Sequence, residues 1–322
     1  MQEPVVSAPP LAQQFAIVED RYGPRIAWVF GNQDKGGVCP YRRAGLCHHC
    51  DIGDGEGREF TTQMNRDRLR WFMEHDRELL PQLAHLVVYN SGSVLNPREL
   101  SPEVLMDICD QTNAMPGLRA LSLDTREAYL DTERLVQLAE RLPKRVCLRP
   151  ILGLESADNE IRDGWLEKRM PRSAICRGLD AVAEAAPQAS PGDIGLDANV
   201  LVGGPGVAAD RVTMDVVETS RWLLHECGQR SLSLDLNLHP YYPSRRGLAR
   251  FPFHPRCSWQ HVQQSVEKIV DLEEFRSSRP GLFIGWQDEQ HDQQQSLRQK
   301  EFEQTQIRMN RFNQTQDPND LH

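Results

Sequence analysis

The 322-residue chain has 39% hydrophobic residues, enough for one large or two small globular domains with a sizeable core. Its formal net charge is −9, which disfavours a protein that grips a long nucleic acid by itself, because such binding depends on neutralising phosphates. No run of 18 or more apolar residues occurs, so no membrane-spanning helix is expected.

Residues 1–20 are weakly patterned, and we interpret them as an N-terminal extension of the domain. The first residues, MQEPVVSAPP, lack the basic and apolar regions of a secretory signal peptide. We therefore expect a cytoplasmic protein whose eight cysteines are reduced rather than paired in disulfides.

From residue 21 to 286, short apolar runs alternate with helical patterns, which favours one domain of βα units around a parallel sheet. The predicted strands are 25–31, 85–89, 118–123, 145–154, 194–202, 231–239 and 281–286. Six or seven such units can form a doubly wound sheet or a full or partial barrel. In each architecture the chemistry lies at the carboxyl ends of the strands.

The loop after the first predicted strand, GGVCPYRRAGLCHHCDIG (36–53), holds three of the eight cysteines: Cys39, Cys47 and Cys50. Its glycines and proline allow tight turns, so we expect three thiolates to converge on one point. Thiolates bind zinc or iron–sulfur clusters. Structural zinc normally has four protein ligands, so three cysteines suit a cluster with one open iron. The alternative is a zinc site with His48 or His49 as the fourth ligand.

Polar and glycine residues follow the other predicted strands, where a parallel sheet would bring them to the same edge. They are the turn 90–93, Arg126, Glu155, the run 203–206, and His239 with Tyr241.

These residues lie in sequence segments that resemble those of a known family. In order, YNSGSVLNPREL, SLDTRE, ILGLESADNEIRD, ANVLVGGPG, LNLHPYY and GLFIGWQDE are similar to the elongator-type branch of the radical S-adenosylmethionine (SAM) superfamily, including the radical protein of archaeosine synthesis. The resemblance covers most of residues 25–290. Two features depart from it: seven residues rather than three separate the first two cysteines, and LNLHPYYPSRRG replaces a polar Asn-Pro phrase.

The resemblance implies an α/β fold, a partial (βα)6-type TIM barrel with parallel strands and the cluster loop after the first strand. Cys39, Cys47 and Cys50 would ligate a [4Fe–4S] cluster whose open iron binds SAM. Arg126 would meet the methionine carboxylate, and Glu155 the ribose or sulfonium end. The full set implied to bind cofactor is His49, Ser91, Gly92, Ser93, Arg126, Glu155, Gly203 and Gly204.

Asn199, His239 and Tyr241 are the substrate candidates. For His239 and Tyr241 the alternative is packing beneath the last loop, and for Arg126 and Glu155 it is an ordinary surface ion pair.

The implied activity is reductive cleavage of SAM to a 5′-deoxyadenosyl radical, which abstracts hydrogen from a small nucleoside- or amino-acid-derived metabolite. A flavodoxin- or ferredoxin-type protein would supply the electron. One alternative is a tRNA base-modifying enzyme with a partner protein, and another is a non-catalytic zinc-stabilised binding protein. The Gln-rich residues 287–322 are expected to be a polar helical or disordered tail that could bind a partner.

Overall fold

The computed structural model describes residues 17–50, 58–189, 194–241, 257–285 and 299–322, and side chains in the last range from 304 onward. These residues form a single eight-stranded sheet whose strands follow one another in chain order. Only β1 and β2 pair antiparallel, and every later pair is parallel. The strands are β1 (Val18–Asp20), β2 (Gly23–Val29), β3 (His85–Tyr89), β4 (Ala120–Thr125), β5 (Cys147–Glu155), β6 (Leu196–Val202), β7 (Leu234–Pro240) and β8 (Gly281–Ile284).

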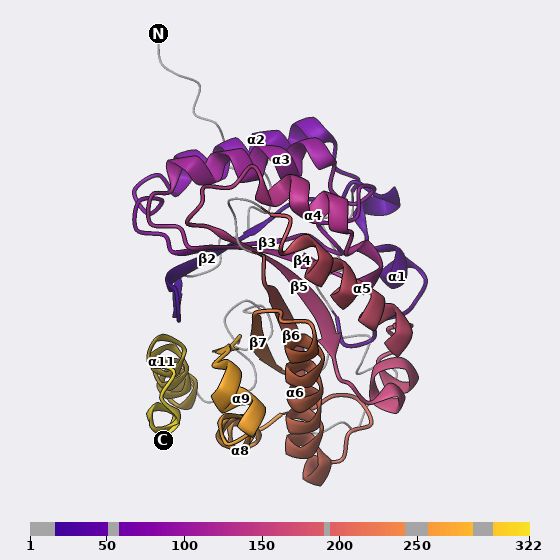
Figure 1. Ribbon diagram of the computed structural model, residues 1–322, viewed down its shortest axis with the longest axis vertical. Helices are drawn as coiled ribbons and strands as arrows, with labels where there is room; N and C mark the ends of the chain where they lie inside the picture. Colours follow the sequence, from indigo (N-terminus) through magenta and orange to yellow (C-terminus); the bar gives the residue numbers. More distant parts are fainter. Residues whose placement is uncertain (1–16, 51–57, 190–193, 242–256, 286–298) are drawn as a thin grey trace.

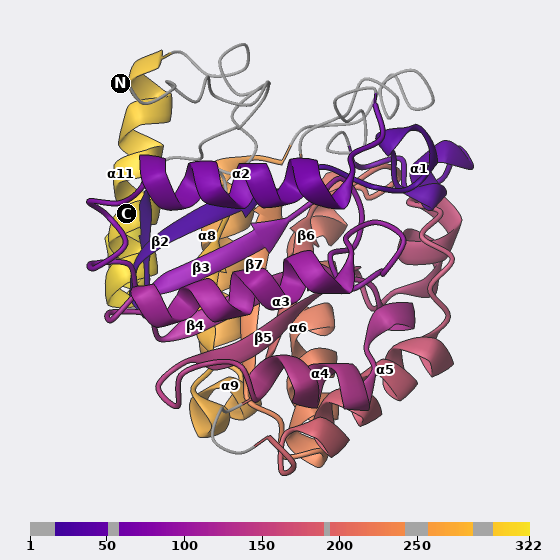
Figure 2. The ribbon, with the colours of Figure 1, turned by 90° about the horizontal axis from the view of Figure 1, so that it is seen from above.

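The sheet curls into a nearly closed barrel with helices along its outer face (Figures 1 and 2). This confirms the predicted partial barrel. A doubly wound sheet would reverse its strand order, and this one does not. The helices are α1 (Pro40–Arg43), α2 (Thr62–His75), α3 (Pro102–Gln111), α4 (Thr132–Ala139), α5 (Arg172–Ala185), α6 (Val212–Gln229), α8 (Trp259–Val270), α9 (Glu273–Ser278) and α11 (Gln299–Thr315).

Local sequence explains where the outer helices begin and which face they bury. Helix α3 starts at Pro102, and the Ser101 side chain accepts a hydrogen bond from the Val104 N–H. Its buried residues recur at helical spacing and pack against the sheet with those of α2, α4, α5 and α6. Among the described helices, none combines the length and apolar character that crossing a membrane requires.

All seven predicted strands occur, although several boundaries shift by one to three residues. One further strand, β1, was not predicted and lies within the predicted N-terminal extension. It is only three residues long, and its pairing with β2 depends on a tight turn at 21–22 that strand periodicity does not reveal.

The tail was predicted to be helical or disordered, and its described residues 299–322 are helical and pack against the barrel. Helix α11 contacts both β1 and β8, the two edges of the sheet (Figure 1). Met309 and Phe312 are buried against the core. The Asn313 side chain donates to the Ile284 carbonyl at 3.1 Å and accepts from its N–H at 2.8 Å. A polar side chain thus satisfies the exposed edge of β8, which would otherwise be open to another strand.

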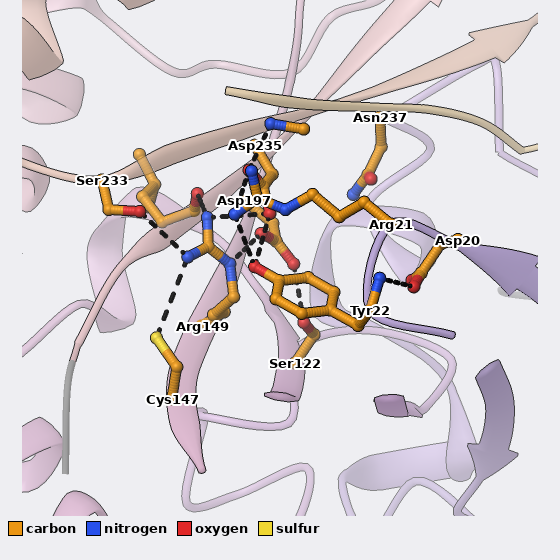
Figure 3. Close-up of polar contacts among 12 residues, drawn as sticks. Asp20, Arg21, Tyr22, Ser122, Cys147, Arg149, Asp197, Ser233, Asp235 and Asn237 are labelled. Carbon is orange, nitrogen blue, oxygen red and sulfur yellow. Dashed lines mark hydrogen bonds and ion pairs between the residues drawn. The ribbon is translucent and has the colours of Figure 1, made fainter. Parts of the chain in front are cut away.

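The floor of the barrel, at the amino ends of the strands, is a buried polar network (Figure 3). Arg149 on β5 donates to Asp197 on β6 at 2.6 Å and lies 3.3 Å from Asp235 on β7. The Ser122 hydroxyl donates to Asp197 at 2.6 Å, and His85 contacts Ser122 at 2.7 Å.

On its other side, the His85 ring lies 2.5 Å from the Asp20 carboxylate of β1. The network therefore connects strands from β1 to β7 through side chains, in addition to their backbone pairing.

Replacing Arg149 by Leu is expected to lower the free energy of unfolding by about 3–5 kcal/mol, because it leaves Asp197 buried without its arginine partner and removes one of the two arginines beside Asp235. Urea unfolding followed by circular dichroism measures the loss. The control is Arg141→Leu, which removes an exposed ion pair to Asp110 and should change stability by less than about 1 kcal/mol. Equal losses in the two variants would contradict a structural role for the floor.

Candidate active site

The carboxyl ends of the strands bring together residues that are far apart in sequence. The cysteine loop follows β2, the turn 90–93 follows β3, Arg126 follows β4, and Glu155 ends β5. A Cβ on Gly92 would lie 3.1 Å from the Cys39 Cβ, so the turn after β3 lies directly against the cysteine loop. The sequence-based prediction that these segments share one edge of the sheet is therefore correct.

Two local features shape the backbone of the cysteine loop. Cys39 precedes the short helix α1; burial raises the pKa of its thiol, and the nearby backbone of Arg42 and Tyr41 opposes that rise. Cys47 has a left-handed backbone with φ of 53°, and the Cys50 N–H donates to its carbonyl at 3.2 Å. None of the three cysteines is in a disulfide and each is only partly buried, so their thiols are accessible to a bound group.

The convergence of the three thiolates on one bound group stays a prediction. Within the described ranges, no three His, Cys, Asp or Glu side chains are placed to hold one metal ion. A cubane cluster needs no such placement, since each cysteine binds a different iron. Three soft donors on one loop, partly exposed and beside a cationic side chain, therefore fit a cluster better than a single zinc ion.

The two histidines of the loop face carboxylates rather than the thiols. His48 Nε2 lies 3.2 Å from Glu167, and His49 Nε2 lies 3.5 Å from Glu155. Both rings are mostly buried. Neither is placed as the fourth ligand that the zinc alternative requires.

Arg126 is part of the wall around the cysteines. Its guanidinium stacks on the Tyr41 ring at 3.6 Å and lies 3.7 Å from the Cys47 sulfur. It also donates to the Lys168 carbonyl at 2.5 Å. Because Arg126 is 8% exposed, it is not an ordinary surface residue, and its predicted role toward the methionine carboxylate stays a prediction.

Glu155 is the centre of a buried ionic cluster at the mouth of the barrel. Lys168 Nζ donates to its Oε1 at 3.0 Å, beside His49. Burial alone would raise the pKa of Glu155, but Lys168, His49 and His239 together hold it well below its ordinary value. Burial lowers the pKa of His49, which favours the neutral ring. Glu155 is therefore a fixed anion.

Sequence reasoning missed Lys168. It follows a π-helical turn, and its neighbours Glu167 and Arg169 both have left-handed backbones, with φ of 51° and 50°. Left-handed non-glycine residues are strained, and no sequence motif announces them. Glu155 itself has φ of 71°. The Ser156 hydroxyl next to it donates to Asp215 on α6 at 2.7 Å, which fixes this strained turn against the outer helix.

The remaining predicted residues line the other side of the barrel mouth. Gly203 and Gly204 have φ of 92° and 149°, a conformation that favours glycine. Asn199 accepts a hydrogen bond from Asn237 at 3.1 Å, and both point into the barrel by strand alternation. His239 packs on Gly285 and influences Glu155 electrostatically.

Tyr241 is buried and its N–H continues the β6 pairing by donating to Val202, which favours packing over substrate contact. Tyr242 and the rest of the PYYPSRRG loop lie outside the described residues.

A cavity of about 500 Å³ lies elsewhere, at the junction of α9, β8 and α11. Its lining includes Phe275, Leu282 and Phe312, with Arg21 and Arg279 at the edge. It contains none of the predicted site residues. We assign the chemistry to the strand ends because the thiols and the buried ionic cluster are there.

The fold is that of the radical SAM enzymes. The chain superposes on methylornithine synthase (PylB) with a TM-score of 0.53 and 12% identity, covering 89% of this chain and 81% of that one. It superposes on SuiB from Streptococcus suis bound to S-adenosylmethionine with a TM-score of 0.51 and 10% identity, covering 84% of this chain and 52% of that one. At these identities the likeness establishes the fold.

Comparisons of the sequence with known proteins give less information about the family than the fold does. No family model matches the chain. An uncharacterized protein of Methanocaldococcus jannaschii is 23% identical over 145 residues, which cover 44% of this chain and 39% of that protein. The chain therefore spans well under half of that curated relative, and about half of SuiB. The elongator-type branch stays a prediction.

Replacing Lys168 by Met should destabilise the protein by about 3–5 kcal/mol near pH 7, because Glu155 then loses its cationic partner. Since the pKa of Glu155 is lowered on folding, the stability it contributes is present above its ordinary value of 4.5 and is lost as the pH falls. Urea unfolding at pH 7 and pH 4 should show the gap between variant and wild type shrinking at the lower pH. Lys168→Arg is the control that keeps the charge, and a gap independent of pH would contradict the ion pair.

Asp215→Asn should stabilise the protein by about 1–3 kcal/mol at pH 7.5. Burial raises the pKa of Asp215 to about 6, so folding opposes its ionisation, and stability falls as the pH rises from 3.8 through 6. The amide oxygen of Asn can still accept the Ser156 hydrogen bond. Thermal unfolding at pH 7.5 and pH 4 checks this, because the gain should disappear at pH 4. A loss of stability at pH 7.5 that disappears at pH 4 would contradict this and show that the ionised carboxylate is needed.

Proposed function

We propose that the protein is a radical SAM enzyme in which Cys39, Cys47 and Cys50 hold a [4Fe–4S] cluster. The supporting observation is the placement of three partly buried cysteines, none in a disulfide, on one loop at the carboxyl ends of this barrel. When bound, the cluster supplies the electron that cleaves SAM to methionine and a 5′-deoxyadenosyl radical, which abstracts hydrogen from the substrate.

The chain's own residues would bind and orient SAM beside the cysteines. The turn formed by Ser91, Gly92 and Ser93 adjoins Cys39 and offers backbone groups to the methionine end. Glu155, kept anionic by Lys168, offers a fixed acceptor to the ribose hydroxyls. Gly203 and Gly204 leave room for a flat ring to approach the backbone. Burial of the ionic cluster limits the access of water, which strengthens these polar contacts.

The substrate that we propose is a small polar metabolite derived from a nucleoside or an amino acid. The Asn199–Asn237 pair on the inner wall provides amide groups for hydrogen bonding, and the mouth residues Glu155 and His239 add polar contacts. One structural neighbour is a methylornithine synthase and another was solved with a precursor peptide, which supports substrates of amino-acid type. The net charge of −9 gives little support to tRNA, which stays the alternative and would require a partner protein.

We propose a flavodoxin- or ferredoxin-type protein as the electron donor. The described part of the tail is already packed against β1 and β8, so a partner-binding role for it gains no support. A cytoplasmic location stays a prediction.

Anaerobically reconstituted protein should contain about four iron and four sulfide per chain and, once reduced, should form 5′-deoxyadenosine from SAM. Replacing Cys39, Cys47 or Cys50 by Ala should abolish product formation, measured by liquid chromatography. Cys109→Ala is the control, because that thiol is buried in the core and far from the loop in sequence. A colourless protein with stoichiometric zinc would instead support the zinc-stabilised binding protein.

The substrate class can be tested by adding either a small-molecule extract or bulk tRNA to the reduced enzyme. A small metabolite should raise 5′-deoxyadenosine formation above the background in a reaction that depends little on salt. If only tRNA stimulates the reaction and the effect collapses by orders of magnitude as salt rises, tRNA modification is the function.

A further inference from the structure

Glu99 is a buried carboxylate that connects the loops after β2 and β3. Its Oε2 accepts hydrogen bonds from the Ser93 N–H at 3.1 Å and from the Asn32 amide at 2.9 Å, and its Oε1 accepts from the Asn96 amide at 2.6 Å. Its backbone carbonyl accepts from the Gln33 N–H at 2.9 Å. One residue therefore fastens the segment that leads into the cysteine loop to the turn predicted to bind SAM.

The same carboxylate lies against the first cysteine. A Cβ on Gly92 would come within 1.5 Å of Glu99 Oε2 and 3.1 Å of the Cys39 Cβ, so both residues occupy the space beside this glycine. No larger residue fits at position 92 unless Glu99 moves. Glu99 and Cys39 also interact electrostatically.

The hydrogen-bond donors around Glu99 are fixed by their own contacts. The Asn32 side-chain oxygen accepts from the Asp34 N–H at 2.7 Å, and that of Asn96 accepts from the Arg98 N–H at 3.1 Å. Neither amide can turn its oxygen toward Glu99 without losing that bond. All three side-chain contacts of Glu99 therefore come from donors, and these bonds oppose the rise in the pKa of Glu99 that burial causes.

We propose that Glu99 is the positioning residue of the site: it fixes the cysteine loop against the turn formed by Ser91, Gly92 and Ser93, and it places a carboxylate beside Cys39. The effect of that carboxylate on a cluster rests on the proposed function. Net charge and nearby dipoles set the reduction potential of an iron–sulfur cluster, so an ionised carboxylate beside one ligand makes the cluster harder to reduce.

The test uses Glu99→Gln, which keeps the size of the side chain but removes its charge. The new NH₂ group has to face at least one donor, because the amides of Asn32 and Asn96 cannot turn. The matched control is Glu103→Gln, the same substitution at an exposed position on α3.

Hydrogen exchange followed by mass spectrometry on the metal-free protein tests the positioning role. Glu99→Gln should speed exchange at least several-fold in peptides that contain 31–34 and 91–93, with no change in β6 and β7 and none in the Glu103→Gln control. Exchange equal to wild type in both segments would overturn the proposal. If Glu99→Gln does not fold, Asn32→Ala removes one of the three bonds and should speed exchange in the same two segments.

The reduction potential of the reconstituted cluster tests the effect of the Glu99 carboxylate. The midpoint potential, followed by electron paramagnetic resonance, should be more positive in Glu99→Gln than in wild type. Asn32→Ala removes a hydrogen bond but leaves the carboxylate, so it should not reproduce that shift. A fully loaded Glu99→Gln cluster with the wild-type potential would overturn the electrostatic part. If wild type itself holds no cluster, the proposed function fails, and the exchange experiment still decides whether Glu99 positions the loops.

Discussion

The structure depends on charged side chains that are buried in pairs inside the barrel. Arg149 with Asp197 and Asp235 forms the floor, and Lys168 with Glu155 lies at the mouth. Removing a charge from water costs several kcal/mol, which is compensated only when partners and hydrogen bonds are well placed. The strands and loops that supply these partners are therefore held at fixed positions relative to one another.

Between floor and mouth, the inner wall of the barrel has an apolar side and a polar side. Ala27, Val87, Tyr89 and Ile151 on β2, β3 and β5 form a small interior cluster that is separate from the larger core between sheet and helices. The Asn199–Asn237 pair lies on β6 and β7. The floor stabilises the fold, while the mouth carries the groups that a ligand would meet, a division expected of barrels whose chemistry lies at one end.

Backbone strain is concentrated near the proposed site. Cys47, Glu155, Glu167 and Arg169 are non-glycine residues with left-handed backbones, and each costs on the order of 1 kcal/mol or more. They persist because neighbouring contacts fix them: Lys168 bonds to Glu155, Ser156 bonds to Asp215, and Arg126 bonds to the carbonyl between the two strained residues 167 and 169. The side chains of the site are thus positioned before any ligand binds, which lowers the entropic cost of binding.

The sequence by itself determined the seven parallel strands and the loop with Cys39, Cys47 and Cys50, because strand periodicity and residue spacing are local properties. That the strands form a barrel rather than a doubly wound sheet was implied only by the family resemblance, and the strand order decided it. The sequence also predicted the edge of the sheet at which Glu155 and Arg126 lie, because the carboxyl ends of parallel strands all lie on the same side. Only the tertiary structure decided what these residues contact. Lys168 lies in a loop outside the segments that resemble the family, and Glu99 lies within YNSGSVLNPREL, a segment that does not reveal its contacts. Lys168 bonds to Glu155, 13 residues away, and Glu99 bonds to Asn32, 67 residues away. The packing of α11 likewise depends on the unpaired edges of β1 and β8, which exist only once the sheet has formed.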